Sequence, residues 1–516
     1  MRILMIDIDT LRPDHLGCYG YHRNTSPNID SIAARGVRFT NNYITDAPCL
    51  PSRSALWSGR TGFHTGVVGH GGTAADPHVE GHFRGFRDRY HATSFTSALR
   101  KAGYYTTTVS TFGERHAAWW WYAGWNEVFN CGGGGMEIAD NVTPHALSWL
   151  DEHAEEDNWF LHVNYWDPHT PYRTPEGFGN PFEDEPLDPW YTEELRQRCF
   201  EGFGSHSAQE LHNYPSPELF KWINSFPRIN MSSLSSMAEV KRWIDGYDVG
   251  IRYADTHVGY LLEKLRDKGI ADDVAIVLTS DHGENQGELN VWGDHQSADD
   301  ITCRVPLIIS WPGVVDEPRV DKALHQHFDW AATVLELAGG SVPEKWDGCS
   351  FAKEMKEQQE AGRDYVVTSQ AAWACQRGVR FDHDGKEYIC LRTYHDGHKD
   401  FDEVMLYCLT DDPREENNLA KEKPALVQQA MAYLADWHHE QMVTADSDVD
   451  PMVTVLCEGG PYHTRGMLKN YIKVLEDTGR VEHAETLKKT AYGRIVRGLP
   501  LLTKLYSFAK SWAVDN

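Results

Sequence analysis

The sequence predicts an α/β fold with a mostly parallel sheet flanked by helices, followed by a smaller C-terminal α+β domain. Apolar stretches that end in polar residues alternate with helical patterns through the first two thirds of the chain. Such alternation is typical of parallel strands joined by helical crossovers. After about Tyr365 the pattern changes to short alternating strands, and 516 residues are enough for two domains. We expect the first domain to span residues 1–364 and the second 365–516.

Each expected element follows from a local pattern. Short apolar runs predict strands of the first domain at residues 2–9, 37–39, 104–110, 159–164, 274–279 and 306–310. Amphipathic or capped stretches predict helices at 27–36, 94–102, 144–153 (opened by Pro144), 235–267 and 328–338. Residues 173–232 are rich in proline, aromatic and acidic residues with weak periodicity, and are interpreted as a long insertion over the sheet end. The second domain is expected to have strands at 365–369, 377–382 and 386–392, and a helix after 424.

Composition excludes several classes of protein. The formal net charge of −27 argues against nucleic-acid binding, which needs a basic face. No run approaches the roughly 18 apolar residues of a membrane span. The opening apolar run is too short for a signal peptide, so we expect a cytoplasmic protein. The ten cysteines form no CxxC pair, which favours free thiols over a zinc site or a disulfide framework.

Residues 481–516 combine basic residues with leucine, tyrosine, phenylalanine and tryptophan in a helical pattern. We expect this tail to pack on its own domain or on a second copy of the chain, which would make a homo-oligomer. A helix lying on a membrane surface is the alternative.

The segment 47–60 combines a cysteine with helix signals. Pro48 and Pro51 fix the backbone, Ser52 is a candidate N-cap, and Gly59 ends the helix. Cys49 would then lie at the positive end of the helix dipole, a setting that makes a thiol reactive. A buried structural cysteine at a tight turn is the alternative.

Acids and histidines follow three of the predicted strands. These pairs are Asp7 with Asp9, Asp167 with His169, and Asp281 with His282. One polar residue at a strand end usually belongs to a turn. Because carboxyl ends of parallel strands meet at one sheet edge, several such residues indicate an active site.

These motifs resemble the type I sulfatases of the alkaline phosphatase superfamily, and the match covers most of the chain. The cysteine motif, residues 49–53 (CLPSR) with Leu56 and Gly59–Arg60, is the most specific part. The other matching segments are 9–17 (DTLRPDHLG), 167–172 (DPHTPY), 279–284 (TSDHGE), 304–307 (RVPL) and 412–419 (DPREENNL). The resemblance implies an alkaline-phosphatase-like sheet.

The resemblance also implies that a maturation enzyme oxidises Cys49 to Cα-formylglycine, which hydrates to a diol. Asp9, Asp281 and His282 would hold a divalent cation together with an oxygen of residue 49. Such a site suits Ca²⁺, with Mg²⁺ as the second choice. Many relatives have a second acid where this chain has Thr10, and Asp7 is either its replacement or a strand-end residue.

The same resemblance suggests roles for further residues. Arg53 would hold the hydrated aldehyde, and His169 would protonate the departing alcohol. His116 is placed with them among the catalytic residues. Three residues are expected to bind substrate: Arg115, His295 and His70. Arg115 and His116 stand in for a Lys-x-His that the family has after the strand at 104–110. His295 follows Asp294, which stands where relatives have a lysine.

Two features near these residues leave alternatives open. His64 either supports the helix or touches substrate. The aromatic residues Trp119–Tyr122 and Trp125 are interpreted chiefly as core, with one or two available to stack on a sugar ring.

We therefore predict a sulfatase that acts on a sulfate monoester of a small saccharide. A phosphodiesterase or phosphonate monoester hydrolase of the same superfamily is the first alternative, since the nucleophile and metal site are shared. A non-enzymatic, metal-holding binding protein with an unmodified Cys49 thiol is the second.

Overall fold

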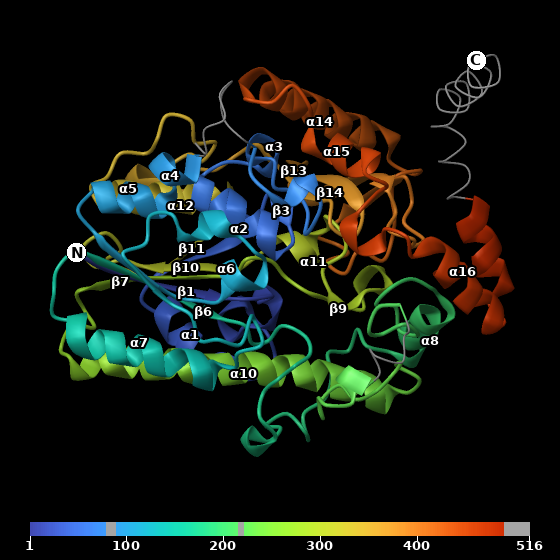
Figure 1. The fold of residues 1–516 in the computed structure, drawn as a ribbon, viewed down its shortest axis with the longest axis horizontal. Helices are drawn as coiled ribbons and strands as arrows, with labels where there is room; N and C mark the ends of the chain where they lie inside the picture. The colour runs from blue at the N-terminus through green and yellow to red at the C-terminus, as the bar shows by residue number, and fades with distance from the viewer. Residues whose placement is uncertain (79–88, 215–220, 490–516) are drawn as a thin grey trace, which may run out of the picture.

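A central sheet of eight strands runs through the protein in the computed structural model, which describes residues 1–78, 89–214 and 221–489 (Figure 1). The strand order is β11-β2-β10-β7-β1-β6-β4-β5. β10 is antiparallel to both neighbours, and the other pairs are parallel. The strands are β1 (Arg2–Ile8), β2 (Val37–Tyr43), β4 (Tyr105–Val109), β5 (Glu127–Phe129), β6 (Trp159–Tyr165), β7 (Val274–Thr279), β10 (Leu307–Ser310) and β11 (Arg319–Gln326). The predicted mostly parallel sheet is confirmed.

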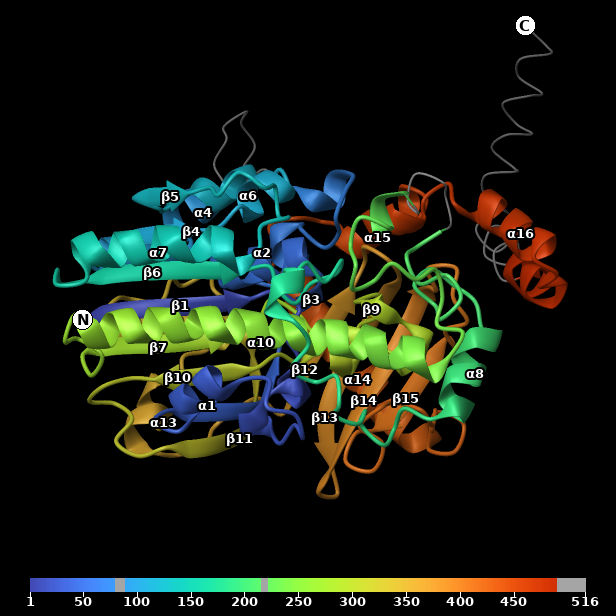
Figure 2. The same ribbon diagram turned by 90° about the horizontal axis from the view of Figure 1, so that it is seen from below.

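Helices cover both faces of this sheet (Figures 1 and 2). Alternate residues of β1 point to opposite faces: Leu4 and Ile6 belong to one apolar core, Ile3 and Met5 to the other. One face carries α1 (Pro27–Ala33), α7 (Ala139–His153) and α10 (Met237–Asp267). The other carries α2 (Cys49–Ser58), α5 (Phe95–Lys101) and α12 (His327–Leu337). Burial on both sides explains why β1, β6 and β7 are almost continuously apolar.

The predicted start of α7 at Pro144 is wrong. The helix begins at Ala139, and Pro144 lies inside it. The Asp167 carboxylate, from the loop after β6, accepts a hydrogen bond from the Ala139 amide at 3.0 Å. This contact satisfies an amide of the first turn that has no partner within the helix. The cap comes from a residue distant in sequence, so local signals did not reveal it.

Cys49 is the first residue of α2, at the positive end of the helix as predicted. Ser52 is not the N-cap. It lies in the first turn, and its hydroxyl donates to the Asp281 carbonyl oxygen at 2.5 Å. Gly59 ends the helix at φ 66°, and a Cβ at this position would lie 2.0 Å from the Trp346 indole. The Ser52 hydrogen bond and the close approach of Trp346 to Gly59 both fix the helix that carries residue 49.

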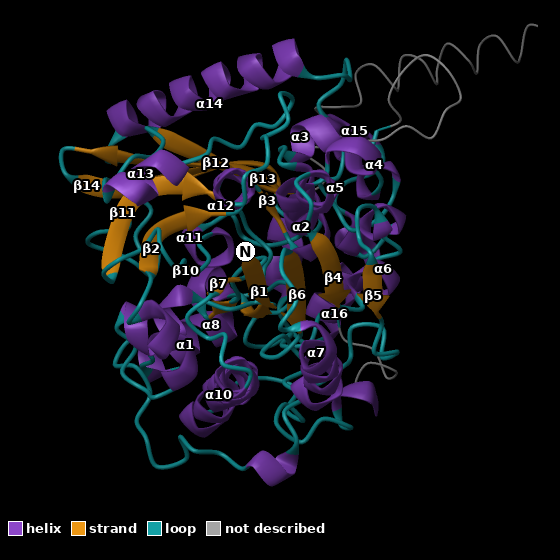
Figure 3. Cartoon of the chain, turned by 90° about the vertical axis from the view of Figure 1, so that its left-hand side faces the viewer, coloured by secondary structure: helices purple, strands orange, loops and turns teal. Residues whose placement is uncertain are grey.

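A second sheet of five strands has the order β15-β14-β13-β12-β3. β12 (Tyr365–Gln370), β13 (Cys375–His383), β14 (Lys386–His395) and β15 (Val404–Cys408) come from the late chain, and α14 (Pro424–Thr444) packs on them (Figure 3). β3 (Asp46–Ala47) comes from the early chain and pairs in parallel with β12. The second sheet thereby holds the segment just before Cys49. The boundary between residues 364 and 365 stays a prediction.

The described chain also has shorter α-helices and strands. They are α3 (Gly62–Thr65), α4 (Arg89–Thr93), α6 (Phe112–Arg115), α8 (Glu193–Glu201), β8 (Asn285–Gln286), β9 (Trp292–Asp294), α11 (Asp300–Cys303), α13 (Ala352–Glu357), α15 (Pro451–Cys457) and α16 (Leu468–Asp477). None of the helices in the described ranges is long and apolar enough to cross a membrane. Most of the predicted C-terminal tail, 490–516, lies outside the described residues.

Candidate active site

Four predicted metal ligands converge at the carboxyl end of the central sheet. Asp9 follows β1, Asp281 and His282 follow the neighbouring strand β7, and Cys49 begins α2. Their ligand atoms all lie within 4.8 Å of one another. Each residue is at most 2% exposed. Neighbouring parallel strands therefore bring together groups that lie more than 200 positions apart in the sequence.

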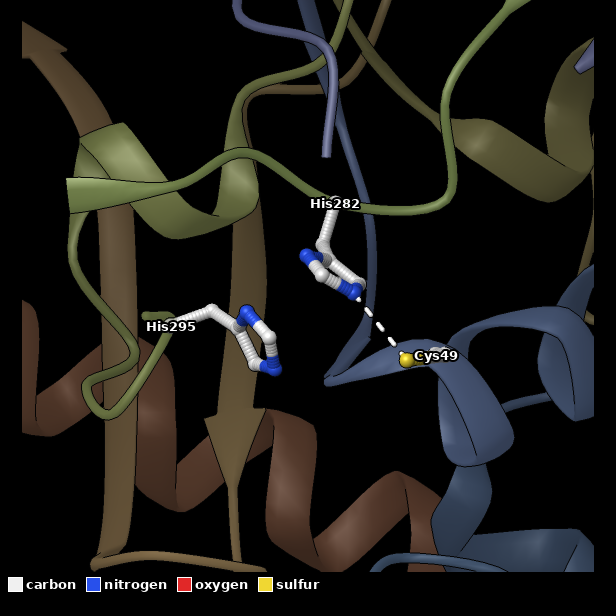
Figure 4. Close-up of side chains that lie close together, drawn as sticks. All are labelled: Cys49, His282 and His295. Atoms are coloured by element: carbon white, nitrogen blue, oxygen red, sulfur yellow. Dashed lines mark hydrogen bonds between the residues drawn. The ribbon is translucent and has the colours of Figure 1, made fainter. Parts of the chain in front are cut away.

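The His282 ring is oriented as a metal ligand requires. Its Nδ1 donates a hydrogen bond to the Gly283 carbonyl oxygen at 2.8 Å, so Nε2 carries the lone pair. Nε2 lies 3.3 Å from the Cys49 Sγ (Figure 4). The Asp9 Oδ1 atom is buried without a hydrogen-bond partner. This set of donors suits a divalent cation. It has two carboxylates, one with a buried oxygen that lacks a hydrogen-bond partner, and an imidazole nitrogen that carries no proton.

Arg53 lies one turn along α2 and is fully buried among three carboxylates. Its Nε donates to Asp7 Oδ2 at 3.0 Å and its Nη1 to Asp9 Oδ2 at 3.1 Å, while Nη1 also pairs with Asp281. His162 Nε2 lies 3.5 Å from the same Asp7 oxygen. Asp7 is therefore a partner of Arg53, and it lies outside the group of candidate ligands.

Electrostatics disfavour a thiolate at residue 49. Burial, followed by the charges of Asp9 and Asp281, raises the pKa of the Cys49 thiol well above its ordinary value. The positive charges of Arg115 and Arg53 act in the opposite direction and do not prevail. An unmodified Cys49 would stay a neutral thiol, which agrees with a cysteine that is the precursor of the nucleophile.

A cavity of about 660 Å³ opens above this group. Six predicted catalytic or substrate-binding residues line it: Cys49, His70, Arg115, His116, His169 and His295. The volume is typical of a site for a small ligand. Sequence reasoning missed several other lining residues, among them His206, His212, Trp243, Trp373 and His463. They come from the insertion, from α10 and from the late chain, where no motif marked them.

His169 and His116 each have one ring nitrogen available for proton transfer. His169 Nδ1 donates to the Thr170 carbonyl oxygen at 2.6 Å, which leaves Nε2 as its proton-exchanging atom. Burial lowers the pKa of His169 to about 3. His116 Nε2 is buried without a partner, and burial followed by Arg115 holds the pKa of His116 well below its ordinary value. Both imidazoles are neutral at pH 7 before substrate binds.

Arg115 is the cation of the cavity. Its Nη1 donates to the Gly135 carbonyl oxygen at 2.9 Å, and its guanidinium lies over the Trp166 ring at 4.9 Å. These two contacts hold the guanidinium in one orientation, and its charge favours the anionic form of residue 49. Arg115 is thus suited to an anionic substrate group at the nucleophile.

Asp294 and His295 lie beside His282, one of the four candidate ligands. The His295 ring lies 4.1 Å from that of His282, centre to centre (Figure 4). Asp294 Oδ2 pairs with His206 Nε2 at 3.0 Å and accepts from Gln296 at 2.9 Å. Cys49, His282 and His295 also form a group with metal-ligand spacing. His295 is therefore close enough to the metal position to serve as a substrate contact.

His64 and the aromatic segment 119–125, for which the sequence leaves a role at the substrate open, lie outside the cavity lining. His64 does not line the cavity: its Nδ1 bonds Asp347 at 2.7 Å and its Nε2 bonds Thr444 at 2.9 Å. Trp120, Trp121 and Trp125 are buried in the core beside α2 and α5. Trp119 and Tyr122 are about half exposed, at 47% and 46%, and neither lines the cavity. No residue of this aromatic segment is available there to stack on a sugar.

Comparison with known proteins decides the family. The sulfatase family profile matches residues 2–341, and a profile described as N-sulphoglucosamine sulphohydrolase, C-terminal, matches residues 287–440. The protein belongs to the sulfatase family. The sulfatase is 23% identical over 89% of its length to the N-acetylglucosamine-6-O-sulfatase of Bacteroides thetaiotaomicron, covering 89% of that protein. It is 26% identical over 78% of its length to the choline-sulfatase of Rhizobium meliloti, covering 79% of that protein.

Solved structures show the same fold. One is a protein in complex with its substrate D-glucosamine-2-N,6-O-disulfate, with a TM-score of 0.68 and 20% identity over 87% of this chain and 99% of that one. Another is the phosphonate monoester hydrolase of Silicibacter pomeroyi, with a TM-score of 0.63 and 19% identity over 87% and 96%. The predicted family, α/β fold and sulfuric ester hydrolase class are thus confirmed. The roles of individual site residues stay predictions.

Proposed function

We propose that this sulfatase hydrolyses a sulfate monoester of a small saccharide, with residue 49 matured to formylglycine and Ca²⁺ bound beside it. The observation that carries the proposal is the convergence of Cys49 with Asp9, Asp281 and His282 beneath one cavity. The names of the similar proteins, an N-acetylglucosamine-6-O-sulfatase among them, support a carbohydrate substrate.

Asp9, Asp281, His282 and an oxygen of residue 49 would hold the metal. Carboxylate oxygens favour a hard cation, which places Ca²⁺ first and Mg²⁺ second. When bound, the cation supplies Lewis-acid stabilisation of charge, and formylglycine supplies a hydroxyl nucleophile that is regenerated after sulfate leaves. Formylglycine formation requires an oxidising maturation enzyme, which we propose as a partner of this protein.

Arg53 positions the acidic groups around residue 49. Its contacts with Asp9 and Asp281 fix the carboxylates, and Asp7 holds the guanidinium from behind. The buried Nη2 has no partner. We propose that this nitrogen contributes a donor to the hydrated aldehyde. Burial makes such a fixed charge more effective than it would be in water.

His169 is proposed to protonate the departing alcohol through Nε2. The negative charge of a bound sulfate ester raises the pKa of a nearby imidazole, which offsets the effect of burial. His116 is proposed as the base that takes the proton from residue 49 when sulfate is released. Arg115, His295 and His70 are proposed to bind the substrate, with Arg115 directed to the sulfate group.

A leaving-group series tests the role of His169. For His169→Gln, we expect kcat/KM for an alkyl or saccharide sulfate to fall by about 10²–10⁴-fold. The fall in kcat/KM for 4-nitrophenyl sulfate should be much smaller, because 4-nitrophenolate is a good leaving group that departs without being protonated. Steady-state rates on both esters measure the difference. Equal losses on the two esters would contradict a general-acid role.

Side-by-side rates test the reaction class. We expect kcat/KM for an aryl sulfate to exceed that for an aryl phosphodiester or an aryl phosphonate monoester. A large preference for either phosphorus ester would favour the phosphonate monoester hydrolase alternative. Turnover of none of them by protein from the native host, with residue 49 unmodified, would favour the non-enzymatic binding protein.

A further inference from the structure

The wall of the cavity away from the metal group joins the early segment around Val68 to late parts of the chain. Val68, Ala371 and Val455 share one apolar cluster, so three distant segments pack together there. The turn Tyr462–Thr464 docks on them, with the His463 amide donating to the Ala372 carbonyl oxygen at 3.1 Å. Position 463 lies beyond both ranges matched by the family profiles, 2–341 and 287–440.

Three rings form the surface of this wall. His463 Nε2 lies 3.0 Å from His70 Nδ1, within hydrogen-bond distance. Trp373 stacks on His463 with ring centres 4.4 Å apart and an angle of 21° between the planes. All three line the cavity. The wall thus offers aromatic faces and a neutral hydrogen-bonding pair to whatever lies beside the sulfate.

Positive charge is scarce in this cavity. Among the described residues that line it, Arg115 is the one lysine or arginine and Asp294 the one carboxylate. The charge of Arg115 acts on residue 49, so this cation belongs to the sulfate end. Burial lowers the pKa of His463 and of His212 to about 4, and that of His70 well below its ordinary value. Among the described residues that line the cavity, no lysine or arginine accompanies these histidines in the wall away from residue 49.

Asp294 adds a fixed negative charge. It is 4% exposed, and its pKa lies well below its ordinary value because the charges of His206 and His295 outweigh the effect of burial. A second anionic group on a substrate would meet this carboxylate, and none of the described lining residues near it is a lysine or arginine. Desolvating an unpaired charge is unfavourable, and the net charge of −27 increases the repulsion.

We infer that the cavity selects sulfate esters whose leaving group is uncharged, and that it discriminates against leaving groups bearing a carboxylate or a second sulfate. The inference rests on the proposed function and specifies its substrate class. Its basis is the placement of Arg115 at the nucleophile and of Asp294, Trp373 and His463 in the wall of the same cavity.

Two matched pairs of esters test this selection with the matured protein. They are 4-carbamoylphenyl sulfate against 4-carboxyphenyl sulfate, and N-acetylglucosamine 6-sulfate against glucosamine 2-N,6-O-disulfate. We expect kcat/KM to be at least about tenfold higher for the uncharged member of a hydrolysed pair. Equal rates, or a preference for the anionic member, would overturn the inference while leaving sulfatase activity established. Hydrolysis of none of the four would overturn the proposed function and this inference with it.

A charge placed on the wall provides the second test. The measured quantity is kcat/KM for the anionic ester divided by kcat/KM for its uncharged partner. His463→Lys should raise this ratio by about fivefold, and the rise should be smaller in 0.5 M salt. His463→Gln is the matched neutral control, and its ratio should stay within about twofold of the wild type. The same shift in both variants, or no shift with lysine, would contradict the inference.

Discussion

Replacing Cys49 by alanine is expected to lower kcat/KM for an aryl sulfate by at least about 10⁴-fold, because the loss of a nucleophile is among the largest single effects in an enzyme. The fold should persist, since a small side chain is removed at the first turn of α2. Peptide mass spectrometry of the wild type should show a loss of roughly 18 Da at residue 49, as conversion of thiol to aldehyde requires.

Cys390→Ala is the matched control. Cys390 is also fully buried, but it lies in the core of the second sheet, away from the cavity. This variant should keep activity near that of the wild type, so general damage from losing a buried thiol is separated from loss of the nucleophile. Substantial activity in Cys49→Ala, or an unmodified thiol in active protein, would contradict the mechanism.

Asp281→Asn is expected to abolish the response of the protein to divalent cations. In the wild type stripped with a chelator, Ca²⁺ at a hundredfold excess over its Kd should raise the free energy of unfolding by about 2.7 kcal/mol. The asparagine variant loses a charged ligand of the group around Cys49. We expect no rise in Tm on adding Ca²⁺ and at least about a 100-fold loss of kcat/KM.

Asp7→Asn is the informative comparison, because Asp7 contacts Arg53 and lies outside the ligand group. This variant should keep the Ca²⁺-induced rise in Tm while its activity falls through a misplaced Arg53. Differential scanning fluorimetry with Ca²⁺ and with Mg²⁺ measures both variants and ranks the two metals. Loss of the metal response in Asp7→Asn with retention in Asp281→Asn would reverse the assignment.

Much of the fold was predictable from local patterns. The buried strands β1, β6 and β7 are continuous apolar runs that end in polar residues, so both their positions and the polar sheet edge followed from the sequence. Gly59 ended α2 as expected, because few residues other than glycine adopt φ near 66°. Asp9, Asp281 and His282 were candidate site residues for the same reason, because they follow the ends of β1 and β7. Their expected role as metal ligands, with residue 49, came from the resemblance to sulfatases.

Other features depended on contacts that no local pattern records. The start of α7 is set by Asp167, a cap from another element, and Ser52 bonds the loop of Asp281 in place of capping its own helix. Asp7 lies in β1 and Asp9 directly follows it, two residues on, so their spacing in the sequence did not separate them. In the structure both contact Arg53, and only Asp9 lies within the group that has metal-ligand spacing.

By itself, the sequence determined the sheet, the family and the residues that carry charge and chemistry, because these follow from periodicity and from motifs within single segments. Only the tertiary structure decided which side chains share the cavity. Trp373 and His463 reach it from the late chain, whereas Trp120, Trp121 and Trp125 lie in the core. The residues that line the cavity around the leaving group are set by how distant segments pack together. The sequence of one segment does not reveal which other segment it packs against.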